Sequence, residues 1–374
     1  MTATQIQGTT QAEDDFDASM FEALRESIAG VLAEHCGSTQ LHAFIDGKNA
    51  LDKTLWAQAG SLGWLGVGIP EQYGGLDLGA RGLALVHGEI GQQSAPGPYI
   101  ATLSAGRVLV ECADEATQAT WLPRLASGEI SAAVPAALDE AALTRDSAGV
   151  SGELRCLGNA EAAFVLAPVA DDWAIVELSG ADIAPVGIWD RTREVIDVRF
   201  RDAKPLCVLP GAQATRRALT RAMALAIAAD GAGGARSITE RTIEYMKTRQ
   251  QFGQPIAGFQ ALKHRAADLV TRLAVMDETL AHAVERTTAD APDADIWVSL
   301  AKSEVTEAAV FVTTDCVQLH GGVGFTWDFD PHIYLKRARL NEVLVMANTA
   351  LRDRAADDLA AVTMSGGSAL ELEA

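Results

Sequence analysis

The chain has 374 residues, 48% of them hydrophobic, which is enough to bury a sizeable core and predicts two or three domains. Its formal net charge of −20 argues against nucleic acid and anionic membrane surfaces as main partners. The five cysteines are widely spaced without a CxxC pair, which indicates reduced thiols and neither a disulfide framework nor a metal site. Residues 1–17 lack the apolar core of a signal peptide, and no apolar run reaches membrane-spanning length. We therefore expect a cytoplasmic protein.

The first third of the chain predicts an all-α domain over residues 18–129. Residues 1–17 are polar and acidic, and we expect them to be disordered because they contain little to bury. Apolar residues at helical spacing begin at Phe21 and recur in residues 51–62, 81–93 and 103–110. Proline and paired glycines separate these stretches, which predicts compact loops between the helices.

The pattern changes to short alternating runs after residue 129, which predicts a β domain over residues 130–212. Polar and glycine-containing turns separate the runs, as in a small antiparallel sandwich or barrel, and the length suits six or seven short strands. The runs richest in β-branched and aromatic residues are Phe164–Leu166, Trp173–Val176, Glu194–Phe200 and Leu206–Leu209.

Helical periodicity returns over residues 213–363 and predicts a four-helix bundle. Its clearest apolar stripe runs from Phe259 to Val284 in alternating steps of three and four, close to the seam of a left-handed bundle. The other helices are expected to end near Lys247 and to span residues 295–320 and 331–361, with a flexible tail over 364–374. The fold class is therefore α+β multidomain: an N-terminal all-α domain, a central antiparallel β domain and a C-terminal four-helix bundle.

A glycine-rich run, Gln318–Asp328, lies between two of the predicted bundle helices. Gly321, Gly322 and Gly324 allow positive φ angles and let another group approach the backbone N–H groups, as a pyrophosphate does at helix boundaries. Taken alone, such a run is more often a helix–helix turn without a ligand.

Four motifs resemble those of the acyl-CoA dehydrogenase family, in the family's order and over essentially the whole chain. They are the block Leu55–Gly75, the run Trp121–Gly128, the turn Arg249–Gln260 and the turn Gln318–Gly322. The resemblance implies the three-part fold described above and the FAD-dependent oxidation of an acyl-CoA.

In that family, the last two turns of one subunit hold the adenosine diphosphate half of a FAD whose flavin ring lies in a neighbouring subunit. An arginine fork suits a diphosphate, and the amide, the aromatic face and the glycines suit the rest of the nucleotide. Without the resemblance, the arginine would be read as a helix-terminal surface residue and the phenylalanine as a core residue. The resemblance implies that FAD contacts Arg249, Gln251, Phe252, Gln318, Gly321 and Gly322.

Two family features are missing from the sequence. The loop and the Trp-Ile-Thr strand that contact the flavin ring in the family are replaced here by Val134–Gly149 and Leu154–Ala160. The glutamate that removes the substrate α-proton is absent from both places where members carry it, Leu344–Thr349 and Arg221–Leu225. We therefore expect no catalytic residue and no complete flavin-ring pocket in this chain.

Three acids near the glycine turn are candidates to replace the missing base. Glu342 lies within about one helical turn of the expected position, and we interpret it as a solvated residue of the bundle. Asp328 and Asp330 precede Pro331 at a predicted helix start, and we interpret them as capping or structural acids.

These absences resemble a group of actinobacterial acyl-CoA dehydrogenases that act on steroid side-chain CoA thioesters as α2β2 heterotetramers. The runs Gly324–Asp328 and His332–Arg337 resemble that group as well. The resemblance implies that this chain is a non-catalytic subunit with a homologous catalytic subunit as its partner. The partner would hold most of the acyl-CoA, and an electron-transferring flavoprotein is a candidate acceptor. The alternatives are a self-sufficient homotetramer with Glu342 as the base, and a non-redox paralogue that binds CoA thioesters or a partner protein.

Overall fold

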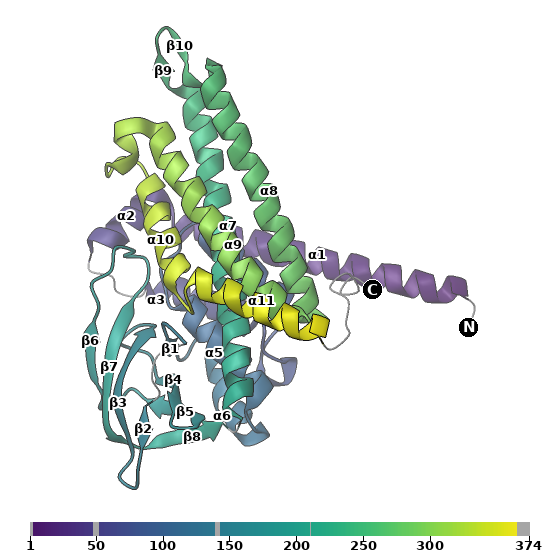
Figure 1. The fold of residues 1–374 in the computed structure, drawn as a ribbon, viewed down its shortest axis with the longest axis vertical. Coiled ribbons are helices and arrows are strands. Elements are labelled where there is room, and N and C mark those ends of the chain that lie inside the picture. Colours follow the sequence, from purple (N-terminus) through teal and green to yellow (C-terminus); the bar gives the residue numbers. More distant parts are fainter. Residues whose placement is uncertain (1–2, 48–51, 139–142, 210, 365–374) are drawn as a thin grey trace.

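The structure, a computed structural model, describes residues 3–47, 52–138, 143–209 and 211–364, with only the backbone course given for residues 3–18. The chain forms helices first, then a sheet, then long helices (Figure 1), as the sequence predicts. The N-terminal helices are α1 (Ala3–His35), α2 (Ser38–Asp46), α3 (Lys53–Ser61), α4 (Gly79–Gln92), α5 (Tyr99–Cys112) and α6 (Glu115–Ala126).

Two parts of the N-terminal domain differ from the sequence prediction. Helix α1 begins at Ala3, whereas disorder was predicted over residues 1–17; the segment contains no proline to stop the helix. Helix α2 was not predicted, because a distant acid holds it: Asp330 Oδ1 accepts a hydrogen bond from Ser38 Oγ at 2.7 Å and lies 2.9 Å from His42 Nε2. A nine-residue helix is marginal without such contacts, and local periodicity cannot reveal them.

The central part of the described chain is an eight-stranded sheet in the order β6-β7-β3-β1-β4-β5-β8, with β2 paired to β3. The four strands predicted from the sequence correspond to β4, β5, β7 and β8, which confirms them. The strands are β1 (Ala132–Pro135), β2 (Thr144–Arg145), β3 (Val150–Leu157), β4 (Phe164–Val169), β5 (Asp172–Glu177), β6 (Asp182–Pro185), β7 (Val195–Ala203) and β8 (Pro205–Leu209).

The sequence predicted an antiparallel β domain, but the sheet contains one parallel pair of strands. Strand β1 pairs antiparallel with β3 on one edge and parallel with β4 on the other. Because β3 and β4 run in opposite directions along the two edges of β1, one of these pairs has to be parallel. Within the described residues the sheet contains eight strands, whereas six or seven were predicted.

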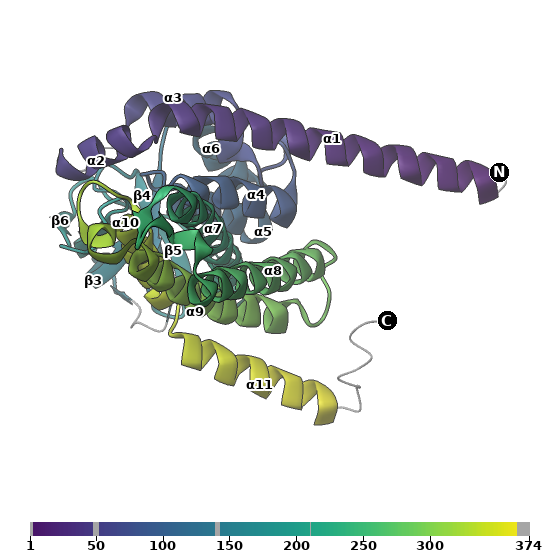
Figure 2. The same cartoon turned by 90° about the horizontal axis from the view of Figure 1, so that it is seen from above.

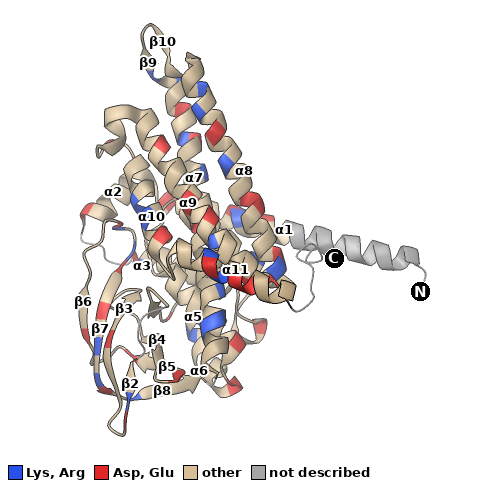
Figure 3. Cartoon of the chain, viewed as in Figure 1, with Lys and Arg blue, Asp and Glu red and all other residues tan. Residues whose placement is uncertain are grey.

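Charged residues of both signs occur on the neighbouring strands β3, β6 and β7 (Figure 3). They form cross-strand ion pairs, such as Arg155 with Asp197 at 2.8 Å and Arg201 with Asp182 at 2.8 Å. Exposed pairs of this kind contribute only about 0–1 kcal/mol each, so their main effect is to keep this face of the sheet solvated.

The C-terminal part contains α7 (Ala212–Thr248), α8 (Gln260–Thr288), α9 (Ala294–His320), α10 (Pro331–Val343) and α11 (Asn348–Met364). Viewed from above, α7, α8 and α9 run side by side and α11 lies along their outer edge (Figure 2). Among the described residues, each helix is too short or too polar to span a bilayer. The tail predicted to be flexible lies outside the described residues beyond Met364.

The last bundle helix is broken, whereas the sequence predicted one helix over residues 331–361. Between α10 and α11, Val345 takes a positive φ of 70° and pairs in parallel with Ala137, which follows β1. Its N–H donates to Ala136 O and its carbonyl accepts from Leu138 N, each at 2.8 Å. The backbone thus leaves the helix to pair with the β domain.

The break is also held by Lys302 of α9, whose side chain is fully buried. Its Nζ donates to the carbonyls of Glu342 and Met346 at 2.8 and 2.9 Å, and to Asn348 Oδ1 at 2.8 Å. An ammonium at a helix C-terminus supplies donors to carbonyls that lack intrahelical partners. Burial lowers the pKa of Lys302 to about 8, which still leaves it protonated at neutral pH.

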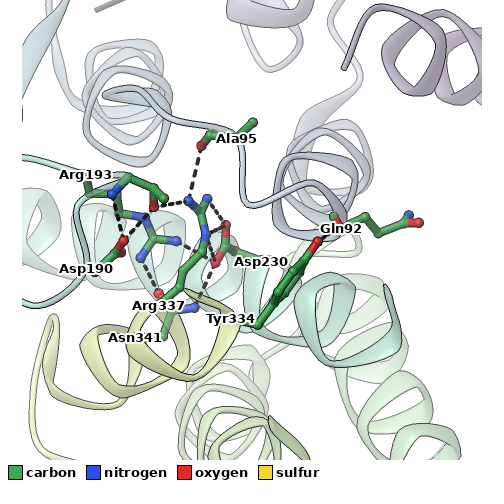
Figure 4. A network of polar contacts seen from close by, with 9 residues as sticks. Gln92, Ala95, Asp190, Arg193, Asp230, Tyr334, Arg337 and Asn341 are labelled. Carbon is green, nitrogen blue, oxygen red and sulfur yellow. Dashed lines mark hydrogen bonds and ion pairs between the residues drawn. The ribbon is translucent and has the colours of Figure 1, made fainter. Parts of the chain in front are cut away.

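A buried ionic network joins the three parts of the fold (Figure 4). At its centre, Asp230 of α7 binds Arg193, which precedes β7, and Arg337 of α10, each through an N–O distance of 2.5 Å. Arg337 also donates to Ala95 O, which follows α4, at 3.2 Å. Burial alone would raise the pKa of Asp230, but the two guanidinium groups outweigh it and hold the pKa far below its usual range.

His87 of α4 lies fully buried beside this network. Neither ring nitrogen has a hydrogen-bond partner among the described residues. Burial lowers the pKa of His87 to about 4, and the nearby guanidinium groups oppose the attraction of Asp230. The imidazole is therefore neutral in the folded protein at any pH near 7.

We predict that Asp230→Asn lowers the free energy of unfolding by about 3–5 kcal/mol, because it leaves two buried guanidinium groups without their counter-charge. Urea unfolding followed by circular dichroism measures the change, with the exposed Asp353→Asn as the matched control. A loss below about 1 kcal/mol would show that the network does not hold the domains together.

We also predict that folding stability falls as the pH drops from 6.5 toward 4, with His87 contributing up to about 1.4 kcal/mol per pH unit. Stability falls with decreasing pH because the folded-state pKa of His87 is lowered. Over this pH range the histidine is protonated in the unfolded chain but stays neutral in the folded chain. Urea unfolding at pH 7 and at pH 5 measures the effect. His87→Leu should reduce the difference in the free energy of unfolding between these two pH values by about 2 kcal/mol. His264→Leu, an exposed histidine on α8, should leave it unchanged.

Candidate functional site

The two predicted ligand-binding turns meet at one end of the bundle. The first follows α7 and carries Arg249, and the second follows α9 and carries Gly321. The rings of Tyr245 and His320, near the ends of these helices, stack with centroids 4.3 Å apart. The Tyr245 hydroxyl also donates to His320 O at 3.4 Å. The structure therefore brings together motifs that lie about seventy residues apart in the sequence.

The first turn is a projecting hairpin of β9 (Gln250–Gln251) and β10 (Gln254–Pro255), at the top of the bundle in Figure 1. Its two loop residues, Phe252 and Gly253, have φ angles of 53° and 80°. Such a turn favours small residues, and a phenylalanine with positive φ is strained. Phe252 is nevertheless 92% exposed. The alternative interpretation, that it is a core residue without a ligand, is therefore wrong.

The glycines of the second turn have two different structural roles. A Cβ on Gly324 would lie 2.6 Å from Val317 O, so this position is closed by packing. Gly321 and Gly322 face open space, since a Cβ at either position would meet no other atom within 4 Å, and Gly321 has a φ of 66°. Their backbone is therefore accessible to an external group, in the short 3-10 helix η4 (Gly321–Phe325).

The polar residues of this end lie exposed beside the two turns. Arg249 makes no ion pair within the described part of the chain, and its N–H caps α7 by donating to Tyr245 O at 2.8 Å. Gln251 and Gln318 are also exposed. We call the six predicted residues the bundle-end site: an unpaired guanidinium, two amides, an exposed aromatic ring and open glycine backbone. This set of groups suits a phosphate attached to a planar ring.

The segment where the family carries its base contains no acid among Leu344–Thr349. Glu342, at the end of α10, pairs instead with Arg339 through an N–O distance of 3.0 Å on the outer side of the helix. Asp328 is exposed, and Asp330 is a structural acid that joins α2 to Arg241 of α7 at 2.9 Å. Asp330 precedes α10 as predicted, but its side chain makes no capping hydrogen bond.

A small cavity lies beside Leu157, Gly158 and Asn159, in the segment that replaces the family's Trp-Ile-Thr strand. The cavity there has a volume of about 20 Å³, room for one or two water molecules. The backbone hydrogen bonds of Val345 with Ala136 and Leu138 join the β domain to the bundle. Part of the loop after β1, residues 139–142, lies outside the described residues.

Within the described residues, no group of three His, Cys, Asp or Glu side chains is arranged to hold a metal ion. The sequence analysis missed Lys302, Asp230 and Arg337. A signal was present for two of them: Asp230 stands in a run of alanines and glycines, and Lys302 in a helix of mostly buried residues. A charge in such a context is usually paired inside the protein.

Comparison with known proteins identifies the relationship. Residues 20–129 match the description "Acyl-CoA dehydrogenase, N-terminal domain", and residues 211–356 match "Acyl-CoA dehydrogenase, C-terminal domain". The chain is 32% identical over 318 residues to acyl-CoA dehydrogenase IpdE2 of Mycobacterium tuberculosis, which covers 85% of this chain and 90% of the relative. It is 28% identical over 355 residues to FadE34 of the same organism, covering 90% of this chain but only 48% of that relative.

Solved structures of the family have the same fold as this chain. The steroid ACAD structure Tcur3481-Tcur3483 superposes with a TM-score of 0.85 at 25% identity, covering 93% of this chain and 99% of that one. The ChsE4-ChsE5 complex from Mycobacterium tuberculosis superposes with a TM-score of 0.81 at 23% identity, covering 91% and 97%. By both of its domain matches and by a relative similar along most of its length, this chain belongs to the acyl-CoA dehydrogenase family.

Proposed function

We propose that this chain is the non-catalytic subunit of a heteromeric, FAD-dependent acyl-CoA dehydrogenase, and that it completes the ADP half of a FAD site in a homologous catalytic subunit. The observation that carries the proposal is a contrast within the chain. The bundle-end site is open and Arg249 forms no ion pair within the described residues, whereas the connection after α10 carries no acid and its Val345 backbone bonds to Ala136 and Leu138 of the β domain.

The bundle-end site suits the diphosphate and adenosine part of FAD. Arg249 offers a fixed fork of donors to phosphate oxygens, and the open backbone at Gly321 and Gly322 allows close approach. Phe252 offers a ring face that is almost fully exposed in the isolated chain. A strained, exposed aromatic residue is explained if a second molecule covers it.

The flavin ring and the proton abstraction belong to the partner in this proposal. Bound FAD supplies the hydride acceptor for the α,β-desaturation of a CoA thioester, and the reaction also requires a carboxylate near the substrate α-carbon. Here the connection between α10 and α11 carries no acid, and the ammonium of Lys302 holds its backbone from inside. Glu342 points to Arg339, which weakens the alternative of a self-sufficient enzyme with a displaced base.

The comparisons support the heteromeric assembly and the substrate class. One structural neighbour is described as a steroid ACAD of two named components, and another as a complex of ChsE4 with ChsE5. The chain resembles the first along 93% of its length. We accordingly propose a steroid side-chain CoA thioester, held mainly by the partner, as the substrate, and an electron-transferring flavoprotein as the electron acceptor.

Co-expression with a homologous subunit of the family that carries the catalytic glutamate tests the assembly. The chain alone should purify colourless and inactive, whereas the complex should be yellow and should reduce an electron acceptor with an acyl-CoA. A yellow and active single chain would overturn the proposal in favour of a self-sufficient enzyme. A complex that forms without flavin would favour the non-redox paralogue.

Arg249→Ala should lower FAD retention in the complex by about tenfold or more, because it removes charge-assisted hydrogen bonds to the diphosphate that are worth about 1.5–3 kcal/mol. Flavin absorbance per complex after gel filtration measures this effect. The matched control is Arg201→Ala, an exposed arginine on β7. Unchanged flavin content in Arg249→Ala would remove this residue from the site.

A further inference from the structure

A second surface site lies between the β domain and α10. It is a groove of about 320 Å³, at the lower end of the range of small-molecule pockets. Residues from the end of α2, from the connection between β6 and β7, and from the region of η4 and α10 form its walls. We call it the aromatic groove; it is lined by Ile45, Ile188, Trp189, Asp190, Arg191, Phe325, Trp327, Ile333 and Lys336.

Three large aromatic side chains of the groove face solvent. Trp189 is 83% exposed, Phe325 63% and Trp327 52%. Single exposed apolar residues are common, but three aromatic rings that converge on one groove from separate segments are typical of a binding site. The groove uses none of the residues of the bundle-end site.

Trp327 is held in place from within the protein. The rings of His42 and His332 meet it edge-on, with centroids 5.6 and 5.1 Å away. His332 is buried, and Asp330 lies 2.9 Å from His42 Nε2. A ring fixed in this way loses little conformational freedom when a planar ligand stacks on it.

Two cations line the groove without a carboxylate partner. Within the described part of the chain, neither Arg191 nor Lys336 forms an ion pair, and Lys336 Nζ lies 5.4 Å from the centre of the Trp327 ring. Burial, and then repulsion from Arg191, lowers the pKa of Lys336, and the nearby Asp190 opposes this shift. In a chain with a net charge of −20, two neighbouring cations that form no ion pair favour an anionic ligand.

The groove also contains a buried acceptor. Asp190 is 2% exposed, and its Oδ1 accepts hydrogen bonds from the N–H and the hydroxyl of Thr192 at 2.9 and 2.6 Å. Its Oδ2 has no partner among the described residues. The Asp190 carboxylate also attracts the buried guanidinium groups of Arg193 and Arg337, so it connects this wall of the groove to the interior network.

We infer that the aromatic groove binds the adenosine–phosphate part of an adenine nucleotide. Such a ligand offers two features that suit the groove: a flat ring to stack on Trp189 or Trp327, and a phosphate for Arg191 and Lys336. Inorganic phosphate alone does not use the rings, and an apolar acyl chain does not use the charges. The chemistry is shared by coenzyme A, by dinucleotides and by free nucleotides.

Quenching of tryptophan fluorescence in the purified full chain tests the inference, with calorimetry as a second readout. Adenosine 5′-monophosphate should bind, adenosine should bind more weakly, and phosphate alone should not quench. Trp189→Ala should weaken binding by about fivefold or more, as expected for a lost stacking contact. Arg191→Gln should weaken the nucleotide but not adenosine. Adenosine 3′,5′-bisphosphate and ADP, compared in parallel, distinguish a coenzyme A-like from a dinucleotide-like source.

The bundle-end site is itself proposed to hold an adenosine diphosphate, so tryptophan quenching, which reports on Trp189 and Trp327, is the readout that separates the two sites. Arg201→Ala, which removes an exposed arginine on β7, is the control that should leave the quenching unchanged. Absence of nucleotide binding, or equal binding by wild type and Trp189→Ala, would overturn the inference. So would loss of binding when the partner subunit is present, together with protection of the tryptophans from acrylamide, because the groove would then be a protein interface. None of these outcomes decides the proposed function.

Discussion

The contact of Asp230 with Arg193 and Arg337 determines how the three parts of this protein sit together. One residue comes from the first bundle helix, one from the approach to β7 and one from α10, and Arg337 also reaches the backbone after α4. A buried ion pair contributes little net stability compared with apolar packing, but removing one partner is very costly. Its main effect is specificity: no other arrangement of the domains would satisfy two buried guanidinium groups with one carboxylate. The positions of both surface sites follow from this arrangement.

Polar groups between the β domain and the bundle have hydrogen-bond partners within the protein, whereas several charged groups at the surface form no ion pair. Between the β domain and the bundle, Lys302 satisfies the carbonyls at the break after α10, and Val345 pairs with the backbone that follows β1. These groups need no ligand. At the bundle end and in the aromatic groove, Arg249, Arg191 and Lys336 form no ion pair within the described chain. Cations beside exposed aromatic rings are the reason that the proposed binding lies on surfaces, where a second molecule can supply the counter-charge.

Sequence reasoning succeeded where structure is decided locally. The apolar stripe of α8 and the alternating apolar and charged residues of β7 could be predicted, because burial of one face determines the spacing of the apolar residues. It failed where a distant contact decides. Helix α2 depends on Asp330, and the break after α10 depends on Lys302 and on the strand that Val345 joins. The residues of the bundle-end site came from resemblance to a family, whereas the aromatic groove combines segments that no local motif connects.

The run from Gln318 to Asp328 contributes to both surface sites, and its internal packing explains how. Gly324 has no room for a side chain because Val317 O and His320 press against it, so this point of the turn is pinned to the end of α9. On one side of the pinned point, Gly321 and Gly322 face open space at the bundle end. On the other side, Phe325 and Trp327 line the aromatic groove. A turn fixed at its centre presents one half to each of the two proposed sites, with little freedom to move either half. The close packing at Gly324 therefore explains how one short segment would contribute to both proposed sites without one disturbing the other.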